Sequence, residues 1–194
     1  MKHVQHYHYK LYKPCGILCQ FSSNDIKQAK RKRFLSSLGE FPEGIMPVGR
    51  LDEKSEGLLL LTTDGKLCDT INRSGVEKEY YAQLDGEITV AALVNLMQGV
   101  TIGVQGKKYV AKPRFIAKIK APTTLPDACS ALRIGRHRPT SWITLVLTEG
   151  KYRHVRKMTA AIGYPTLRLV RVRIGEITLD GLTEGKCISM GSLL

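Results

Sequence analysis

Short apolar segments with polar residues at every second position recur along this chain, and this alternation is typical of β-strands. They lie near residues 8–12, 16–21, 57–62, 78–85, 108–119, 141–148 and 166–179. The 3.6-residue periodicity of amphipathic helices is present at 64–72, 89–98 and 152–162. Because strands outnumber helices and several connections are short, we expect an α+β fold with a mixed, largely antiparallel sheet and flanking helices.

The size of the chain predicts one folded domain. Its 194 residues, 43% of them hydrophobic, are enough to form a core without disulfides or metal ions. No stretch has the composition of a linker, and 121–131 is interpreted as a long connection between two strands. We therefore expect residues 1–194 to form a single domain.

The sequence has neither a membrane-spanning segment nor a secretory signal. Its longest aliphatic run is Leu58–Leu61, whereas a spanning helix needs roughly 20 apolar residues. The N-terminal MKHVQHYHYK is polar, and the five scattered cysteines lack the spacing of a disulfide framework or a zinc site. His3, His6 and His8 have a spacing that a metal could use, but chain termini are commonly frayed, and we predict no metal there. We expect a cytoplasmic protein with reduced thiols.

The charge of the chain is strongly positive and unevenly placed. The formal net charge is +13, from 30 Lys and Arg against 17 Asp and Glu, which predicts a polyanionic partner. Residues 1–39 hold eight basic groups and one acid, and residues 133–173 hold ten and one. In the first segment, Lys27 and Lys30–Arg33 are either a solvated face or an arm that contacts phosphate.

The second basic segment contains a helix that begins with cations. In TEGKYRHVRKMTAAIG, the spacing of Val155, Met158 and Ile162 after Gly150 predicts a helix that starts near Lys151 or Tyr152. Its first turns would carry Lys151, Arg153, His154, Arg156 and Lys157. Such cations oppose the helix dipole by about 0.3 to 1 kcal/mol per exposed charge, but they would favour a bound phosphate.

A basic strand is predicted after this helix. In TLRLVRVRIG, strict alternation would place Arg171 and Arg173 on one face and Val170, Val172 and Ile174 on the other. A loop before the helix supplies further cations, namely Arg133, Arg136, His137 and Arg138. Together these elements could form one cationic wall along a central basic cleft, as expected of a nucleic-acid-binding protein.

Three side chains are candidates for chemistry. Asp52 lies in a polar turn immediately before a buried strand, where it could be partly desolvated, or it could pair with Arg50 or Lys54 in a surface turn. Alternation directs the ring of Tyr80 inward, either as an ordinary core residue or as a functional phenol. Arg156 could turn partly toward the core if paired with an acid. A carboxylate, a phenol and a guanidinium would suit a reaction on a nucleic-acid base.

Four segments, taken in order, resemble the bacterial pseudouridine synthases that modify ribosomal RNA. The segments are YKLYKPCGILCQF, GRLDEKSEGLLLLTTDG, KEYYAQL and LTEGKYRHVRKMTAAIGYPTLRLVRVRIG. The resemblance covers nearly the whole chain, and PTSWITLVLTEG and MTAAIGYPTLRLVR are most similar to a branch that modifies the large subunit. It implies a pseudouridine synthase fold over residues 1–194, without the N-terminal accessory RNA-binding domain of many relatives.

The resemblance also implies the roles of individual residues. Asp52 matches the essential aspartate, Tyr80 the active-site tyrosine, and Arg156 the basic residue paired with that aspartate. Arg50 matches a motif arginine that helps to extrude the target base, and His154 stands where relatives usually have Gln. The RNA-binding residues would be Arg50, Lys78, Arg136, Arg138, Lys151, Arg153, His154, Lys157, Arg168, Arg171 and Arg173.

The implied reaction detaches uracil from C1′ of its ribose, rotates it and rejoins it through C5, and it requires no cofactor or metal. The expected partner is large-subunit ribosomal RNA, free or in an assembling particle, and the protein is expected to be a monomer without membrane association. The alternative is a non-catalytic RNA-binding or ribosome-assembly protein with the same fold.

Overall fold

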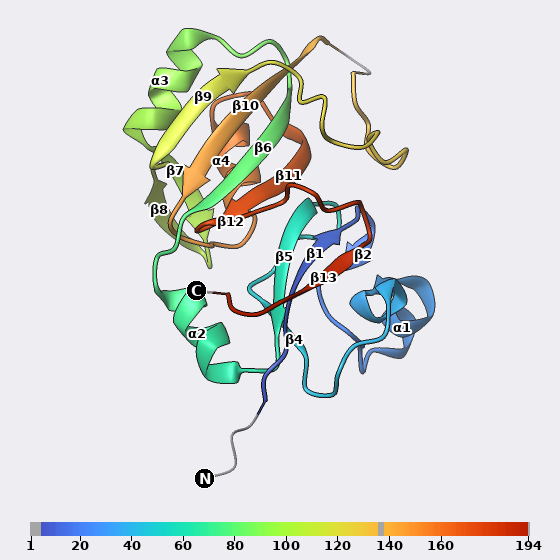
Figure 1. Cartoon of the computed structure of the whole chain (residues 1–194). Helices are drawn as coiled ribbons and strands as arrows, with labels where there is room; N and C mark the ends of the chain where they lie inside the picture. The colour runs from blue at the N-terminus through green and yellow to red at the C-terminus, as the bar shows by residue number, and fades with distance from the viewer. Residues whose placement is uncertain (1–4, 136–137, 194) are drawn as a thin grey trace. The chain divides into compact units, whose positions relative to one another are not determined.

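The computed structural model of the chain describes residues 5–135 and 138–193. The chain divides into two compact units (Figure 1). The first unit comprises Met1–Val76 with Glu176–Leu194, so both ends of the chain belong to it. The second unit is the continuous segment Glu77–Gly175. Each unit has its own set of strands, and the two are described in turn.

The first unit contains an antiparallel sheet with the strand order β13-β1-β5-β4. Its strands are β1 (His8–Lys13), β4 (Met46–Val48), β5 (Glu56–Thr62) and β13 (Cys187–Met190). Its other elements are β2 (Ile17–Leu18), α1 (Ile26–Arg31), β3 (Arg33–Phe34), the 3-10 helix η1 (Leu35–Leu38), α2 (Gly65–Arg73) and β12 (Ile177–Thr178). β2 and β3 form a separate parallel pair.

Strand β5 lies at the centre of this core because all seven of its residues are buried. Burial of consecutive residues, here around the apolar run Leu58–Leu61, is typical of a strand that is covered on both faces. Leu59 and Leu61 pack with residues of β1 and of the following segment, and the resulting cluster comprises Leu11, Ile17, Leu35, Leu59 and Leu61. The strand predicted at 57–62 is therefore confirmed.

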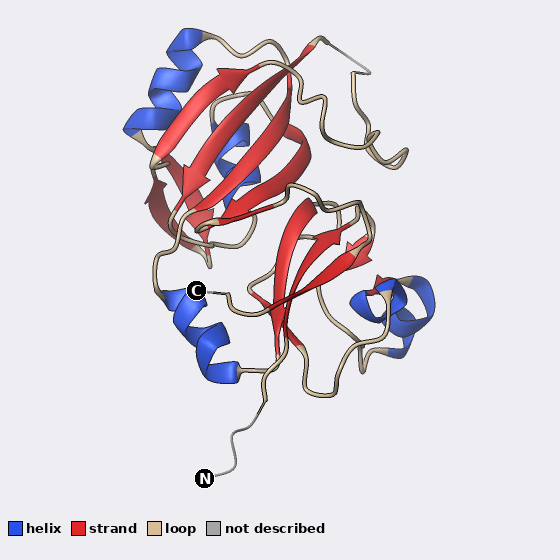
Figure 2. Ribbon diagram, in the orientation of Figure 1, coloured by secondary structure: helices blue, strands red, loops and turns tan. Residues whose placement is uncertain are grey.

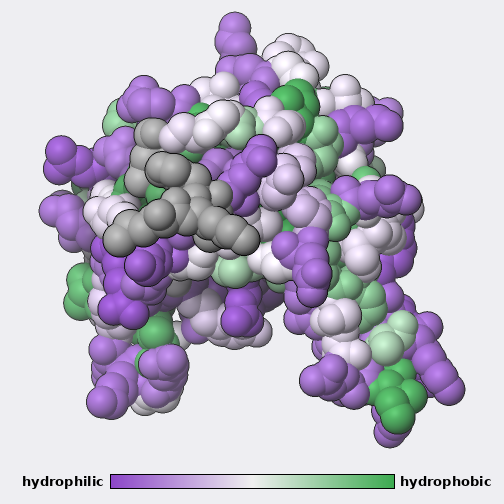
Figure 3. Space-filling view, turned by 60° about the horizontal axis from the view of Figure 1, so that its bottom comes forward, coloured by the Kyte–Doolittle hydropathy of each residue, from purple (hydrophilic) through white to green (hydrophobic). Residues whose placement is uncertain are grey.

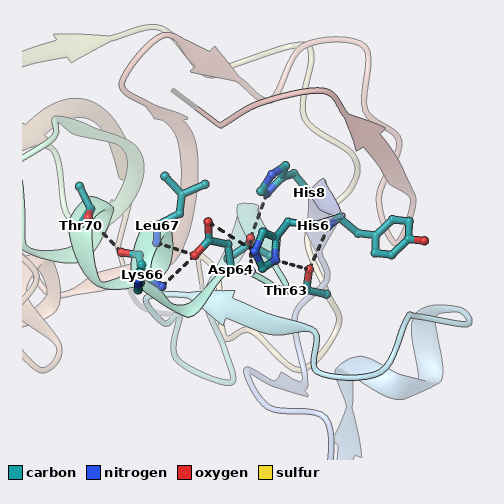
Figure 4. A network of polar contacts seen from close by, with 9 residues as sticks. His6, His8, Thr63, Asp64, Lys66, Leu67 and Thr70 are labelled. Atoms are coloured by element: carbon teal, nitrogen blue, oxygen red, sulfur yellow. Dashed lines mark hydrogen bonds and ion pairs between the residues drawn. The ribbon is translucent and has the colours of Figure 1, made fainter. Parts of the chain in front are cut away.

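Helix α2 begins at a hydrogen-bonded cap directly after β5. The Asp64 carboxylate accepts hydrogen bonds from the backbone N–H groups of Lys66 and Leu67, at 2.9 and 3.1 Å (Figure 4). These bonds, chiefly the one from Leu67, lower the pKa of Asp64, and the nearby His6 and His8 lower it further.

The N-terminal histidines contact this cap region. Nδ1 of His6 lies 3.3 Å from Oγ1 of Thr63, and Nδ1 of His8 lies 2.9 Å from Oγ1 of Thr62. Among residues 5–135 and 138–193, no group of three or more His, Cys, Asp or Glu could hold a metal ion. His3, the remaining member of the histidine cluster, lies outside the described residues.

The second unit is built on an antiparallel sheet with the strand order β11-β6-β10-β9 (Figure 2). Its elements are β6 (Lys78–Asp85), α3 (Val90–Gln98), β7 (Val100–Val104), β8 (Lys107–Ala111), β9 (Phe115–Ile119), β10 (Thr140–Leu147), α4 (His154–Ala161) and β11 (Thr166–Ile174). β7 and β8 form a hairpin, α3 contacts β9, and α4 contacts β7 and β11. The predicted α+β class and largely antiparallel sheet are confirmed.

Two predicted strands are interrupted. The strand expected at 108–119 is divided into β8 and β9 around Pro113, a residue that cannot donate to a strand ladder. The strand expected at 166–179 ends at Ile174, because Gly175 adopts a φ of 54° and turns the chain. Short elements such as α1, β4 and β13 were not predicted, because a few residues carry too little periodicity.

The surface is mainly hydrophilic on the face shown in Figure 3, where hydrophobic side chains form small areas among polar ones. In the part of the chain that the structure describes, no helix is long and apolar enough to span a membrane. All five cysteines, each of them described, are free thiols.

Replacing Asp64 with alanine should lower the melting temperature, because the first N–H groups of α2 lose their acceptor. Asp64→Asn, which keeps a capping oxygen, should lower it less. Asp69→Ala is the control, since Asp69 forms an exposed pair with Arg73 on the same helix. Thermal unfolding followed by circular dichroism measures all three, and equal losses for Asp64→Ala and Asp69→Ala would contradict the capping role.

Candidate active site

Asp52 lies in a turn that leads directly into β5. Asp52 itself is half-buried, while Leu51 before it and Ser55 after it are buried. The backbone N–H of Ser55 donates to the carbonyl of Asp52 at 3.0 Å, which closes the turn. The main chain at Asp52 is thus fixed at the entrance of a fully buried strand.

A buried lysine ties this turn to the end of β1. Lys13 has no exposed surface, and its Nζ donates to the carbonyls of Pro14, Glu53 and Ser55 at 2.9, 3.3 and 2.8 Å. The backbone N–H of Gly16 also donates to the carbonyl of Glu53, at 2.8 Å. Two of the lysine's three acceptors therefore belong to the turn that carries Asp52.

The charge state of Lys13 reflects two opposing effects. Burial lowers its pKa to about 8, while the nearby Cys19, Cys15, Glu56 and Glu53 act to raise it. An ammonium group has three donors, and here all three have a carbonyl acceptor. Lys13 was not predicted as a site residue, although it lies at the end of a predicted strand and directly before a Pro-x-Gly sequence.

Tyr80 occupies the buried face of β6. Burial alternates along this strand, with Lys78, Tyr80, Ala82 and Leu84 buried and the residues between them half-buried. The prediction that Tyr80 shares an inward face with Ala82 and Leu84 is confirmed. Burial, and secondarily the charge of Arg171, lowers the pKa of Lys78 on the same face.

Arg156 lies on α4 and reaches toward β11. Its Nη1 donates to the carbonyl of Thr166 at 3.0 Å, and the residue is half-buried, as predicted. Val155 and Met158 are buried and hold the helix on the unit. The guanidinium is therefore oriented by the helix and by the start of the neighbouring strand.

The start of α4 differs from the prediction. The helix begins at His154, and Arg153 immediately before it has the left-handed φ of 53°. Lys151 and Arg153 therefore precede the helix, and the predicted start near Lys151 or Tyr152 is wrong. Lys151 lies 3.2 Å from the Glu149 carboxylate, and Nζ of Lys157 donates to the carbonyl of Gly103 at 2.6 Å.

His154 is enclosed within the second unit. Only 6% of its surface is exposed, and its ring forms an edge contact with Tyr109 at a centroid distance of 6.1 Å. Burial is the main cause that lowers its pKa below the ordinary 6.5, and the charges of Lys151 and Lys157 act in the same direction. The imidazole is therefore neutral near pH 7.

The arginines of β11 do not follow strict alternation. The ladder with β6 contains a bulge between Arg171 and Arg173, so that Arg171 faces Tyr80 whereas Arg173 faces Glu79. Tyr80 and Glu79 point to opposite faces of β6. The prediction that Arg171 and Arg173 share a face is therefore wrong, because the extra residue shifts the pattern by one.

The predicted RNA contacts divide into buried and exposed groups. Buried are Lys78, His154, Arg168 and Arg171; exposed are Arg50, Arg138, Lys151 and Arg153. Lys157 and Arg173 are half-buried.

Two of these arginines bind carboxylates of the protein itself. Arg173 donates to Glu79 at 2.9 Å and to Glu77 at 3.1 Å. Arg138 lies 3.2 Å from the Asp85 carboxylate and donates to the carbonyl of Gly163. Arg136 and the neighbouring His137 lie outside the described residues.

Comparison with known proteins identifies the family. The model of the RNA pseudouridylate synthase family matches residues 7–161. The chain belongs to this family. The match includes the Asp52 turn, Tyr80 and Arg156, and it confirms the resemblance seen in the sequence motifs.

Relatives and a solved structure agree with this assignment. Ribosomal large subunit pseudouridine synthase E of Xanthomonas campestris pv. campestris is 38% identical over 178 residues, 91% of this chain and 91% of that protein. The synthase E of Xanthomonas axonopodis pv. citri is 40% identical over 174 residues, 89% and 87% of the two chains. A crystal structure of a pseudouridylate synthase, 26% identical, gives a TM-score of 0.72 over 96% of this chain and 70% of that one. The protein is thus an enzyme with the pseudouridine synthase fold that isomerises uridine.

Replacing Lys13 with methionine should lower the free energy of unfolding by about 1 to 3 kcal/mol, because buried carbonyls lose their donor. It should also lower kcat more than it raises KM, since the Asp52 turn is loosened. Lys10→Met on the same strand is the control, because Lys10 donates only an exposed bond to the carbonyl of Asp180. Urea unfolding and steady-state kinetics measure these effects, and identical behaviour of the two variants would contradict this role of Lys13.

Acidification should destabilise the synthase partly through His154. Below its ordinary pKa of 6.5 the unfolded chain binds a proton at this position, whereas the buried, folded imidazole resists protonation. The free energy of unfolding should therefore fall as pH decreases from about 6.5, and His154→Gln should remove part of that slope. Urea unfolding at pH 7.5 and 5.5 measures the slope, and an equal slope for wild type and variant would refute this contribution.

Proposed function

We propose that this synthase converts a specific uridine of large-subunit ribosomal RNA to pseudouridine, with Asp52, Tyr80 and Arg156 as its catalytic residues. The observation that carries the proposal is the Asp52 turn at the entrance of β5, where Lys13 binds the carbonyls of Glu53 and Ser55 directly after the Gly-Arg-Leu-Asp motif. The choice of RNA follows the relatives, which are named as large-subunit enzymes and match this chain over most of its length. We propose that both units act together as one catalytic domain.

Asp52 would act at C1′ of the target nucleotide. Its ionised carboxylate could attack C1′ as a nucleophile while the bond to N1 breaks, or act as base and electrostatic partner in a glycal route. In the nucleophilic route, C5 of the rotated uracil bonds to C1′ as the bond between C1′ and Asp52 breaks. In the glycal route, C5 bonds to C1′ and C2′ regains the proton that Asp52 removed. In both routes C5 then loses its proton, and N1, which has lost its bond to the ribose, gains one. The reaction is an isomerisation with no redox change, and the proposal includes no cofactor or metal.

The other two catalytic residues would prepare the base and the carboxylate. Arg156 would take the role of the basic residue that serves the essential aspartate, as the family resemblance implies. Tyr80 would stack on the extruded uracil, and its phenol is the candidate that assists loss of the C5 proton. Arg50 would help to extrude the base, a step whose cost of a few kcal/mol is offset by phosphate contacts and stacking.

The predicted RNA contacts would fall into two roles. The exposed Arg50, Arg138, Lys151 and Arg153 would contact phosphates directly, together with Lys157 and Arg136. The buried Lys78, His154, Arg168 and Arg171, and the half-buried Arg173 with its two carboxylate partners, would support these contacts indirectly or reach the RNA only after a rearrangement. We further propose that the synthase acts as a cytoplasmic monomer, on free RNA or an assembling particle.

Asp52→Asn should abolish pseudouridine formation, a loss of at least 1,000-fold, because the amide can serve neither as nucleophile nor as base. RNA affinity should change less than tenfold. Chemical mapping of pseudouridines in large-subunit RNA from a deletion strain, complemented with wild type or variant, measures the outcome. Asp69→Asn, an exposed acid on α2, is the control and should restore the modification.

The same strain separates the proposal from the alternative of a non-catalytic ribosome-assembly protein. If Asp52→Asn restored the pseudouridine, the assignment of Asp52 would be wrong. If the deletion strain lost no pseudouridine but accumulated immature large subunits, the assembly role would replace the catalytic one.

A further inference from the structure

A basic arm on the first unit has no role in the proposed site. The arm comprises residues 25–33, which include α1, and five of these nine residues are basic: Lys27, Lys30, Arg31, Lys32 and Arg33. All five are exposed. α1 lies at the outer edge of its unit in Figure 1. The arm thus presents a dense positive charge to solvent.

The core does not account for this composition. Each residue of α1 is exposed or half-buried, and its one large apolar side chain, Ile26, is 71% exposed. A helix of six residues is not stable by itself. It is held by the Asp25 carboxylate, which accepts from the N–H groups of Lys27 and Gln28, and by a side-chain bond between Gln20 and Gln28. Basic residues at the other positions are therefore not required for folding.

Most of the arm's charge is unbalanced. Lys32 pairs with Glu53, and the arm's one acid, Asp25, caps the helix. The side chains of Lys27, Lys30, Arg31 and Arg33 have no hydrogen-bond or ion-pair partner among the described residues. The positive charges of Lys30 and Arg31 interact favourably with the C-terminal end of the helix dipole. Lys27, three and four residues earlier on the same helix, repels both of them. A bound polyanion would relieve this repulsion.

The arm is attached to the turn that carries Asp52. Nζ of Lys32 lies 2.9 Å from both carboxylate oxygens of Glu53, the residue that follows Asp52. The carbonyl of Glu53 is in turn held by Lys13 and by the N–H of Gly16. Within the first unit, the arm is therefore joined through Lys32 and Glu53 to the turn that carries the candidate catalytic carboxylate.

We propose that the arm binds the phosphate backbone of the RNA that flanks the target uridine, with Lys27, Lys30, Arg31 and Arg33 as phosphate contacts and Lys32 as the anchor. This proposal rests on the proposed function, because the partner is the RNA that the synthase modifies. The arm supplies affinity and register, whereas Asp52 supplies chemistry. Phosphate contacts of this kind position an RNA without reading its sequence.

The test is the salt dependence of RNA binding by a variant in which Lys27, Lys30, Arg31 and Arg33 are all replaced by Gln. Each phosphate contact contributes about 0.7 to 0.9 to the slope of log K against log salt, so the slope should become shallower by about 3. KM should rise at least tenfold, with kcat at saturating RNA within twofold of wild type. Thermal unfolding should be unchanged, because none of these side chains is buried.

The matched control replaces four exposed lysines of the second unit by Gln, namely Lys107, Lys108, Lys112 and Lys120. Its slope should change by less than 1 and its KM by less than threefold. Equal changes in the two variants would overturn the proposal, since they would reflect net charge alone. A loss confined to kcat would also overturn it.

The two proposals fail in distinguishable ways. The binding measurement uses a transcript of large-subunit RNA and requires no turnover. If wild type binds this transcript but forms no pseudouridine in any large-subunit RNA, the proposed function fails while the arm's contacts are still measured. If wild type forms pseudouridine and the arm variant binds like the control, only the arm proposal fails.

Discussion

The ammonium group of Lys13, buried beneath the Asp52 turn, is the interaction on which the first unit's candidate chemistry depends. A buried charge is tolerated only when its donors are satisfied, and three backbone carbonyls satisfy this one. Because two of those carbonyls belong to Glu53 and Ser55, the bonds that stabilise the lysine also determine the path of the chain at Asp52. The buried strand β5 then prevents the turn from shifting.

The same turn joins the core of the first unit to the basic arm that we propose as an RNA contact. Glu53 accepts from Lys13 through its carbonyl and from Lys32 through its carboxylate, so one residue joins the core to the basic arm. The basic residues behind the net charge of +13 therefore fall into two groups. Some cations, such as Lys13 and Arg173, bind the protein's own carbonyls and carboxylates, while others remain exposed to solvent.

Much of the fold was predictable from the sequence, because long elements repeat their pattern many times. The strands at β5, β6 and β10 were placed within one residue of their observed bounds. The bulge in β11 and the left-handed backbone at Arg153 were not predictable. Each is a change at a single residue, whereas a periodic pattern is recognised only over several residues. Asp52, Tyr80 and Arg156 were candidates from their positions in a turn, a strand and a helix, and the family resemblance implied their roles. Lys13, by contrast, required knowledge of which carbonyls surround it.

The central claim is that this chain carries out chemistry on uridine through Asp52. Release of tritium from C5 of labelled uridine in a large-subunit RNA transcript tests it most directly, since C5 loses its hydrogen only when the new glycosidic bond forms. Wild type should release one tritium per modified uridine without cleaving the strand, and Asp52→Asn should release none while still binding the RNA. Release by both proteins, or binding without release by wild type, would contradict the account.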